Sequence, residues 1–321
     1  MPQIIGIGGA VFDLLMHVEK FPEPDRGCPL TCSWQYGGKV PTGVCASTRL
    51  GASAAIVTVL GGGMGKACEQ DFIRHGVDVS HIAWDPNGET GMCVAFTQDA
   101  VPGRNIMCYN PARLRNIQME DLDKDFITSG ELLFISQGDE PSITAARWAK
   151  EAGMKVIIDA DGYHPLIAEN MHLIDYFIAS ELYWDACFDH RDWEKGLSQW
   201  REKGPQVCIV TLGEKGLAGM DADGFFELPA FKVNAVDTTG AGDSFHGAFA
   251  YAMVENMPVR EAARFSSAVS AIKCTSMGGR AGLPTRAMVE RFIENGGVLD
   301  AADRAALDER VAYYGRLHMG Y

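Results

Sequence analysis

Short apolar runs and longer amphipathic segments alternate along much of the chain, and this alternation predicts its secondary structure. Strands are expected at residues 3–9, 54–60, 131–136, 155–159, 175–179 and 206–211, with a hairpin at 217–228. Helices are expected at residues 43–50, 141–152, 165–170, 184–203, 245–253, 259–275, 284–294 and 301–316. Strands that alternate with helices form a parallel sheet covered on both faces. The chain is therefore expected to be an α/β protein with a doubly wound, mostly parallel sheet.

Two stretches break this alternation because no helix follows their strands. The prolines between residues 22 and 29 interrupt the first stretch, and short strands are expected around them at 14–19 and 29–36. The second stretch predicts a hairpin of strands 90–97 and 105–109, with its turn at Pro102 and Gly103. Both stretches are expected to lie outside the main sheet, and an extension of its edge is the alternative.

Polar side chains follow several of the predicted strands at the point where each strand ends. Asp13 follows the first strand, and Asp159, Asp161, Ser180 and Thr211 lie at the ends of later ones. The carboxyl ends of parallel strands form the ligand-binding edge of a doubly wound sheet. These side chains are therefore expected to line a site, although simple helix capping is an alternative for the two aspartates.

The stretch from Asp237 to Phe249 contains the chemistry that is easiest to interpret. Gly240, Ala241 and Gly242 form a tight turn before a predicted helix, whose free amides and positive dipole end favour an anion such as phosphate. A carboxylate repels a phosphate, so Asp243 makes chemical sense as a base that takes a proton from an attacking hydroxyl. A glycine-rich loop with an aspartate as helix cap is the plainer alternative.

Composition and charge narrow the class of protein. The net charge of −14 argues against nucleic acid or an anionic membrane as a partner. The nine cysteines are scattered without zinc-site spacing, which favours free thiols in a reducing compartment. The first residues lack the features of a signal peptide, and no apolar run is long enough to span a bilayer. A cytoplasmic protein is expected.

The string from Asp237 to Phe249 closely resembles the C-terminal signature of the phosphofructokinase B (PfkB), or ribokinase-like, family of carbohydrate kinases. The resemblance implies a three-layer α/β/α fold, as a single domain over residues 1–321, with a small β-strand lid from segments at about 13–36 and 89–110. It also implies ATP as donor, Mg2+ as cofactor, and the primary hydroxyl of a small sugar or sugar acid as acceptor. In this scheme Asp243 is the catalytic base, and the backbone amides of residues 240–243 form the anion hole.

Weaker motifs assign the other site residues by the same resemblance. The acceptor is expected to contact Asp13, Gly37, Gly38, Lys39, Thr42 and Arg104. The nucleotide is expected to contact Ser180, Thr211, Gly213, Gly216, Gly242 and Gly278. Mg2+ is expected near Glu181 through water, and a monovalent cation, K+ in some members, near Asp237, Thr239, Lys273 and Gly278. The lid is also the expected contact of a homodimer.

Several positions depart from the family pattern. Thr42 stands where an asparagine is usual in the acceptor loop, and Ser180 and Tyr183 replace the Asn and Glu of a motif that helps to position magnesium. Asp161 and Tyr163 replace an Asn and an Arg, so one phosphate contact is expected to be missing. These departures imply an altered acceptor and altered metal handling.

Two other functions remain open at this point. A nucleoside kinase of the same fold would stack a base on aromatic lid residues, for which Tyr36, Phe96 and Tyr109 are candidates. A non-catalytic sensor of sugar or nucleotide is suggested by the altered positions. The intact Gly-Ala-Gly-Asp string argues against the sensor, because a binding protein needs no base.

Overall fold

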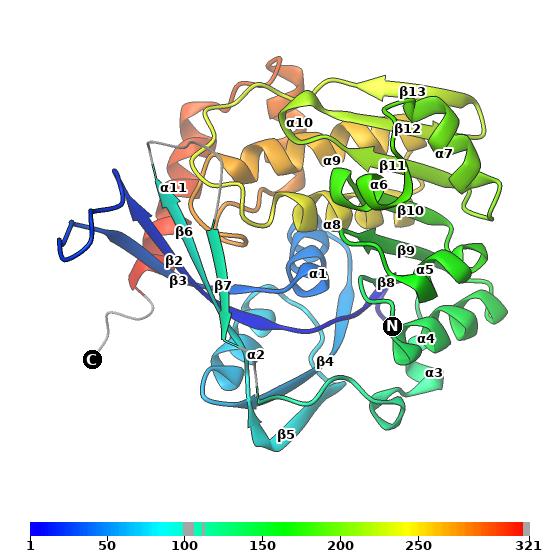
Figure 1. The fold of residues 1–321 in the computed structure, drawn as a ribbon, viewed down its shortest axis with the longest axis horizontal. Coiled ribbons are helices and arrows are strands. Elements are labelled where there is room, and N and C mark those ends of the chain that lie inside the picture. The colour runs from blue at the N-terminus through cyan, green and yellow to red at the C-terminus, as the bar shows by residue number, and fades with distance from the viewer. Residues whose placement is uncertain (99–105, 111–112, 317–321) are drawn as a thin grey trace.

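The protein folds around one large sheet whose strand order brings distant segments together (Figure 1). The structure is a computed structural model that describes residues 1–98, 106–110 and 113–316. In spatial order, the sheet consists of β13 (Gly224–Leu228), β12 (Leu217–Asp221), β11 (Val207–Thr211), β10 (Tyr176–Ser180), β9 (Lys155–Ala160), β8 (Leu132–Ile135), β1 (Ile4–Ile7), β4 (Ala54–Gly62) and β5 (Ile82–Glu89).

The strands from β11 to β5 run parallel, and β12 and β13 are antiparallel additions at one edge. Successive residues of a strand point to opposite faces, so each central strand feeds two cores. In β8, Leu132 and Phe134 pack into one core, whereas Leu133 and Ile135 pack into the other. This burial on both faces explains why the central strands are continuous apolar runs. The edge strand β5 was not predicted, because five of its eight residues are polar or glycine or proline.

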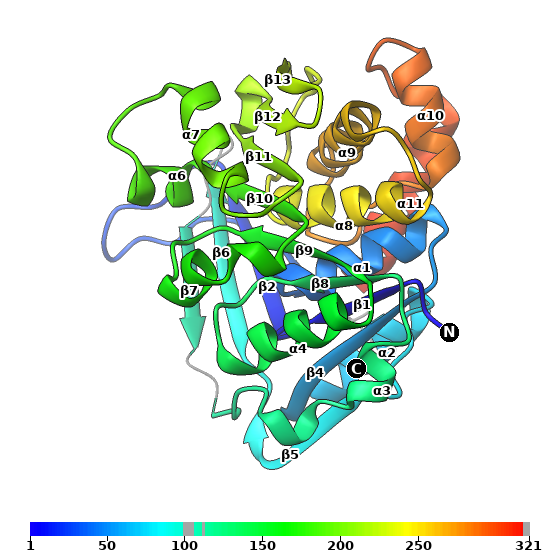
Figure 2. The same cartoon turned by 90° about the vertical axis from the view of Figure 1, so that its right-hand side faces the viewer.

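Helices cover both faces of the sheet, which confirms the three-layer prediction (Figures 1 and 2). One face packs against α1 (Lys39–Leu50), α2 (Gly65–Arg74), α8 (Ala241–Val254), α9 (Val259–Cys274), α10 (Arg286–Glu294) and α11 (Ala301–Arg316). The other face packs against α3 (Lys124–Ile127), α4 (Glu140–Glu151), α5 (Pro165–Glu169), α6 (Glu181–Cys187) and α7 (Trp193–Arg201). Short 3-10 turns occur at Met119–Asp121, Met171–Leu173 and Gly213–Lys215. None of the helices in the described ranges has the length and apolar character needed to cross a bilayer.

A separate four-stranded sheet forms the predicted lid and projects to the left in Figure 1. Its order is β3 (Thr31–Gly37), β2 (Val11–Val18), β6 (Met92–Gln98) and β7 (Ile106–Asn110). The strands β2 and β6 are parallel, and the other neighbours are antiparallel. The prediction of strands outside the main sheet is therefore confirmed, and the edge-extension alternative is wrong. The predicted turn at Pro102 and Gly103 lies outside the described residues.

Three helix boundaries differ from the prediction. Helix α1 begins at Lys39 rather than at residue 43, because Pro41 lies in the first turn, where a missing N–H costs nothing. Helix α8 begins at Ala241 rather than at residue 245, with Gly240 as its cap. The predicted helix 184–203 is two helices, since the side chain of Asp192 accepts from the amide of Lys195 and starts α7 anew.

Helices α1 and α8 approach one another through glycine. A side chain on Gly247 would collide with the backbone of Gly43, so only hydrogen fits at this crossing. The hydroxyl of Ser47 lies 2.8 Å from the carbonyl oxygen of Gly247 and 3.1 Å from that of Gly43. A hydroxyl of α1 therefore contacts backbone carbonyls of both helices at the crossing.

Candidate active site

The glycine turn before α8 leaves two amides free, as an anion site requires. Gly240 has a φ of 77° and caps the helix, while the amide of Ala241 donates to the carbonyl of Thr238 at 3.1 Å. The next intrahelical bond runs from the amide of Ser244 to Gly240. Within the part of the chain that the structure describes, the amides of Gly242 and Asp243 make no backbone hydrogen bond. These two amides and the helix dipole form a positive end that an anion can occupy.

The carboxyl group of Asp243 lies in the first turn of α8, half-buried and close to other charges. Burial raises its pKa to about 6, and the neighbouring carboxylate of Asp159 adds to this increase, whereas His246 and Lys39 oppose it. A carboxyl group whose pKa lies near neutrality accepts a proton more readily than an ordinary aspartate.

One turn further along α8, His246 fastens the helix to the sheet. Its Nδ1 lies 2.7 Å from the carbonyl oxygen of Gly242 and 3.5 Å from Oδ2 of Asp159. Its Nε2 lies 3.3 Å from the carbonyl oxygen of Ile178 in β10. The buried imidazole thus fixes the turn that carries Asp243 against the ends of two strands.

The aspartates at the end of β9 are not helix caps, so that alternative is wrong. The cap of α5 is His164, whose ring nitrogen accepts from the amide of Leu166. Asp161 instead forms an ion pair of 3.0 Å with Lys39. Burial lowers the pKa of Lys39, but the nearby carboxylates outweigh burial and raise it overall, so this side chain stays positively charged.

The predicted acceptor residues converge between the lid and α1. Asp13 lies buried on β2, and a side chain on Gly37 would collide with its carboxylate. Burial raises the pKa of Asp13 to about 7; the charge of Arg280 opposes this, and the carboxylates of Asp243 and Asp237 reinforce it. The charge of Asp243 therefore acts on Asp13, although the two residues are 230 positions apart in the sequence.

The structure places the other acceptor candidates around this pair. Gly38 has a φ of 97°, and a side chain there would collide with the carbonyl oxygen of Gly9. The amide of Thr42 donates to the carbonyl of Gly38 at 2.8 Å, and its buried hydroxyl accepts from Nε of Arg280 at 3.4 Å. Arg104 lies outside the described residues.

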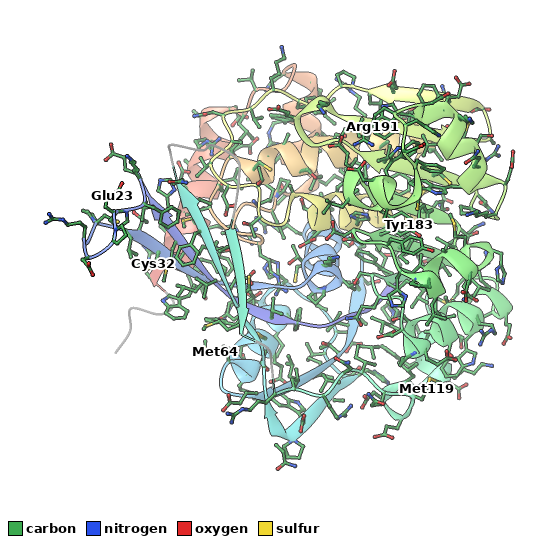
Figure 3. The ribbon with its side chains drawn as sticks, in the orientation of Figure 1. Glu23, Cys32, Met64, Met119, Tyr183 and Arg191 are labelled. Atoms are coloured by element: carbon green, nitrogen blue, oxygen red, sulfur yellow. The ribbon has the colours of Figure 1, made fainter. Side chains whose placement is uncertain are left out.

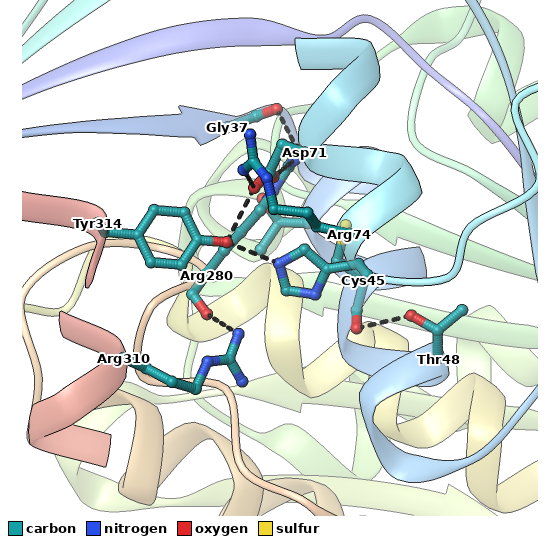
Figure 4. A network of polar contacts seen from close by, with 10 residues as sticks. Gly37, Cys45, Thr48, Asp71, Arg74, Arg280, Arg310 and Tyr314 are labelled. Atoms are coloured by element: carbon teal, nitrogen blue, oxygen red, sulfur yellow. Dashed lines mark hydrogen bonds and ion pairs between the residues drawn. The ribbon is translucent and has the colours of Figure 1, made fainter. Parts of the chain in front are cut away.

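Arg280, in the loop after α9, was not predicted from the sequence, although it contacts the acceptor candidates Gly37 and Thr42. This arginine is fully buried, and it donates to Oδ2 of Asp71 at 2.7 Å and to the carbonyl of Gly37 at 2.8 Å (Figure 4). A second missed residue, Gln35 on β3, donates to the carbonyl of Met277 at 3.0 Å. Gln35 belongs to no motif that was recognised, and an arginine in the glycine-rich stretch 277–284 predicts an exposed loop rather than a buried pair.

The predicted nucleotide residues lie at the ends of β10 and β11. Ser180 and Thr211 are paired in register, and the hydroxyl of Ser180 donates to the carbonyl of Asp161 at 2.7 Å. Gly213 has a φ of 58° and faces open space. Gly216 instead contacts the backbone of Leu228, which explains why it has no side chain. Its nucleotide contact remains a prediction.

The two residues that depart from the expected magnesium motif lie in different surroundings, since Ser180 ends β10 and caps α6, whereas Tyr183 lies within the packed core. Tyr183 is buried on the other side of the sheet, with its ring 5.2 Å from that of Phe177 and 5.7 Å from that of Trp200 (Figure 3). Burial also raises the pKa of its hydroxyl. Glu181 is partly exposed, 3.9 Å from Lys215, and follows Ser180 directly. Carboxylates such as Glu181 and Asp161 supply the oxygen ligands that Mg2+ prefers, so these residues fit the ion.

The residues predicted to hold a monovalent cation lie close together, but the ammonium group of Lys273 already supplies a positive charge among them. The carboxylate of Asp237 accepts from the amides of Thr239 and Gly278, each at 2.8 Å. The ammonium of Lys273, fully buried, donates to the carbonyl of Asp237 at 2.7 Å. Burial raises the pKa of Asp237, but the charge of Lys273 and the two amides outweigh it and lower the pKa overall. A second cation beside this ammonium would be repelled, so the residues do not fit K+.

Comparison with known proteins shows similarity in sequence over most of the chain. Residues 1–286 match the family model described as pfkB family carbohydrate kinase. The ribokinase of Haemophilus influenzae is 30% identical over 270 residues, which cover 81% of this chain and 88% of that protein. A 5-dehydro-2-deoxygluconokinase of Geobacillus kaustophilus is 28% identical over 291 residues, covering 81% and 85%.

Solved structures show the same fold. The ribokinase of Thermotoga maritima, 25% identical, aligns with a TM-score of 0.80 over 92% of this chain and 100% of that chain. The ribokinase of Arabidopsis thaliana, solved with ribose and ATP and 22% identical, aligns with a TM-score of 0.77 over 91% and 99%. A family model that spans most of the chain, together with these relatives, shows that the protein belongs to the pfkB family of carbohydrate kinases, which are phosphotransferases with an alcohol group as acceptor.

Proposed function

We propose that this sugar kinase transfers the γ-phosphoryl group of ATP to a primary hydroxyl of a small sugar or sugar acid. One observation carries the proposal. The carboxyl group of Asp243 lies at the start of α8, beside the free backbone amides of Gly242 and Asp243, and its charge acts on the carboxyl group of Asp13. A base, an anion site and an acceptor-binding carboxylate thus share one small region. That set matches phosphoryl transfer, in which positioning and charge stabilisation supply most of the catalysis.

Each group has one role in the proposed reaction. Asp13 and the loop of Gly37 and Gly38 orient the acceptor, and Asp243 takes the proton of its attacking hydroxyl. Of the predicted anion hole at residues 240–243, the free amides of Gly242 and Asp243 stabilise the negative charge of the phosphoryl group during transfer, whereas the amide of Ala241 is bonded to Thr238. Lys39 brings a positive charge to the same place. Closure of the lid would exclude water and so prevent hydrolysis of ATP.

The nucleotide is proposed to lie along Ser180, Thr211 and Gly213, with Gly278 beside the anion site. Support comes from the Arabidopsis neighbour, which was solved with ATP and ribose. Magnesium, bound with the nucleotide and reached by Glu181 through water, would supply neutralisation of the phosphate charges.

The lid favours a sugar over a nucleoside. Tyr36 is buried, with its ring 5.4 Å from Phe12, and Phe96 packs against Phe21 at 5.8 Å. These aromatic rings already contact one another edge to face, which leaves less of their surface for a base. The side chain of Tyr109 lies outside the described residues.

An acceptor panel tests the proposal directly. ADP release is measured with ATP and magnesium over ribose, 5-dehydro-2-deoxygluconate, other sugars and sugar acids, polyols and nucleosides. We expect one sugar or sugar acid to drive turnover. Faster turnover with a nucleoside than with any sugar or sugar acid would show that the enzyme is a nucleoside kinase instead. Binding of ATP without turnover on any acceptor would favour the sensor and contradict the kinase.

The activity should fall in acid because the base must be ionised. Burial raises the pKa of Asp243 to about 6, so its carboxylate is lost as the pH drops through that value. We expect kcat/KM for the acceptor to level off above pH 7 and to fall about tenfold per pH unit below pH 6. A steady-state pH profile measures this, and a profile flat down to pH 4.5 would remove Asp243 from the role of base.

Turnover should not require K+, because Lys273 supplies the positive charge beside Asp237. We expect the same kcat in potassium chloride and in tetramethylammonium chloride at equal ionic strength. A Lys273→Met variant that folds should lose activity and recover part of it with K+. Strong activation of the parent by K+ would show that an ion binds despite the ammonium.

Two further predictions concern the whole molecule. The lid sheet is proposed as the contact of a homodimer, which analytical ultracentrifugation of the purified chain would reveal. The protein is proposed to work in the cytoplasm with small molecules as its partners, as its acidic net charge of −14 supports.

A further inference from the structure

A pocket lined by residues of α1, α2 and α11 and of the turn after α2 is rich in positive charge. It has a volume of about 340 Å³ and lies where the ends of α1 and α2 meet α11. We call it the α11 pocket, and its lining residues are Thr48, Arg49, Arg74, His75, Arg310, Tyr313 and Tyr314. No acidic residue is among them, in a protein whose net charge is −14. Helix α11, which forms one side of the pocket, lies beyond the residues 1–286 that match the family model.

Arg49 is the residue of the pocket that most needs a partner. Its Nε is buried and has no hydrogen-bond partner among the described residues. Burial lowers its pKa to about 10, and the charge of Arg310 adds to the effect. Buried charges in proteins are normally paired, because an unpaired one loses its hydration without compensation. A guanidinium that faces a second guanidinium instead indicates a missing anion.

Arg310 has no counter-ion either among the residues that the structure describes. Its guanidinium donates to the carbonyl oxygens of Leu283 at 3.1 Å and Arg280 at 3.5 Å, which are neutral acceptors. Burial lowers the pKa of the adjacent His75 to about 3. The charge of Asp71 raises this pKa, whereas the charges of Arg310, Arg280 and Arg49 lower it further. The imidazole stays neutral, and the potential in the pocket stays positive.

The carboxylate of Asp71 lies behind the pocket, and both of its oxygen atoms already accept hydrogen bonds from the protein. Oδ1 of Asp71 accepts from the hydroxyl of Tyr314 at 2.8 Å and from Arg74 at 3.3 Å, and Oδ2 accepts from Arg280 at 2.7 Å (Figure 4). Asp71 therefore cannot also neutralise the pocket. For the same reason Cys45, Asp71 and His75, whose ligand atoms lie within 4.8 Å of one another, do not suit a metal cation.

We propose that the α11 pocket binds a small phosphorylated molecule, with the phosphate held by Arg49, Arg74 and Arg310. Guanidinium groups match phosphate oxygens in pairs, and three of them converge here from three different helices. The volume admits a phosphate with a few carbon atoms. The ring of Tyr313, which is 42% exposed, lies beside the space left for the organic part.

The pocket is linked to the acceptor residues by one buried pair. Arg74 contacts Asp71, and Asp71 holds Arg280, which in turn holds the carbonyl of Gly37 and the hydroxyl of Thr42. A phosphate that draws Arg74 away from Asp71 changes the charge around Arg280. Phosphate binding is therefore expected to change the affinity for the acceptor. This regulatory effect rests on the proposed function, whereas phosphate binding itself does not.

Calorimetry with inorganic phosphate, glycerol 3-phosphate and glycerol tests the binding without any turnover. Arg49→Gln and Arg310→Gln are compared with Arg147→Gln, which removes the same charge from an exposed position on α4. We expect the parent and the Arg147 variant to bind both phosphates but not glycerol, and each pocket variant to bind at least about tenfold more weakly. Phosphate held at the start of α8 would be unaffected by the pocket variants.

The affinities for glycerol 3-phosphate and for inorganic phosphate show whether the pocket prefers a phosphate ester or free phosphate. Tighter binding of glycerol 3-phosphate identifies a phosphate ester, and equal binding identifies inorganic phosphate. Because Arg49 is unpaired, Arg49→Gln should melt no lower than the parent without phosphate and should lose the upward shift that phosphate causes. Equal phosphate binding by parent and both pocket variants, or no binding by the parent, would overturn the proposal.

Discussion

Replacing Asp243 with asparagine is expected to lower kcat by about a thousandfold or more. Asparagine keeps the size of the side chain but cannot accept the proton of the attacking hydroxyl. The free amides of Gly242 and residue 243 would remain, so binding of ATP should survive. Single-turnover measurement of ADP formation, with the preferred acceptor in excess, isolates the chemical step.

The stability of this variant distinguishes a catalytic role from a structural one. The raised pKa of Asp243 means that folding favours its neutral form, so ionisation costs stability above about pH 6. A neutral asparagine removes that cost, and the melting temperature at pH 8 should stay equal or rise. If activity fell because the variant unfolded, or if it stayed within tenfold of the parent, the assignment of the base would be wrong.

Replacing Arg280 with methionine is expected to cost about 3–5 kcal/mol of the free energy of unfolding. Both Arg280 and Asp71 are completely buried, so the change leaves a carboxylate without its main counter-ion. The carbonyl of Gly37 and the hydroxyl of Thr42 also lose a donor. Urea denaturation of parent and variant, followed by circular dichroism, gives the difference.

A surface arginine supplies the matched control. Arg286 forms ion pairs with Glu255 and Glu290, but these side chains are about half exposed and water screens their charges. Arg286→Met should therefore cost less than about 1 kcal/mol. A similarly small loss for Arg280→Met would show that the buried pair adds no net stability. In the surviving folded fraction, the KM for the acceptor should rise more than that for ATP.

The sequence was sufficient for most strands, both sheets and the turn before α8, because these depend on local patterns. Apolar runs identified β8, β9 and β10, and glycines in series identified the turn before α8. The strand β5 escaped because at a sheet edge one row of side chains meets water and need not be apolar. The start of α1 escaped because proline usually ends a helix, whereas the first turn tolerates it.

The parts of the site that could not be predicted depend on contacts between distant residues. The sequence offers no local sign that Arg280 reaches Asp71, which lies 209 residues away, or that Lys273 donates to Asp237. A buried cation looks like a surface residue until its partner is known. Tyr183 shows the converse, since it was identified from the sequence only as the replacement of a glutamate in a magnesium motif, whereas its ring packs against Phe177 and Trp200.

The crossing of Gly43 and Gly247 has a consequence for which substitutions the proposed site can tolerate. Helix α1 carries Lys39 and Thr42, and helix α8 carries Asp243, so the crossing joins the two helices that supply the proposed reaction centre. A side chain at residue 247 would meet the backbone of Gly43 and force the two helices apart. The spacing of Lys39 and Thr42 from Asp243 is therefore expected to depend on residue 247 remaining glycine, although this residue takes no part in the proposed chemistry.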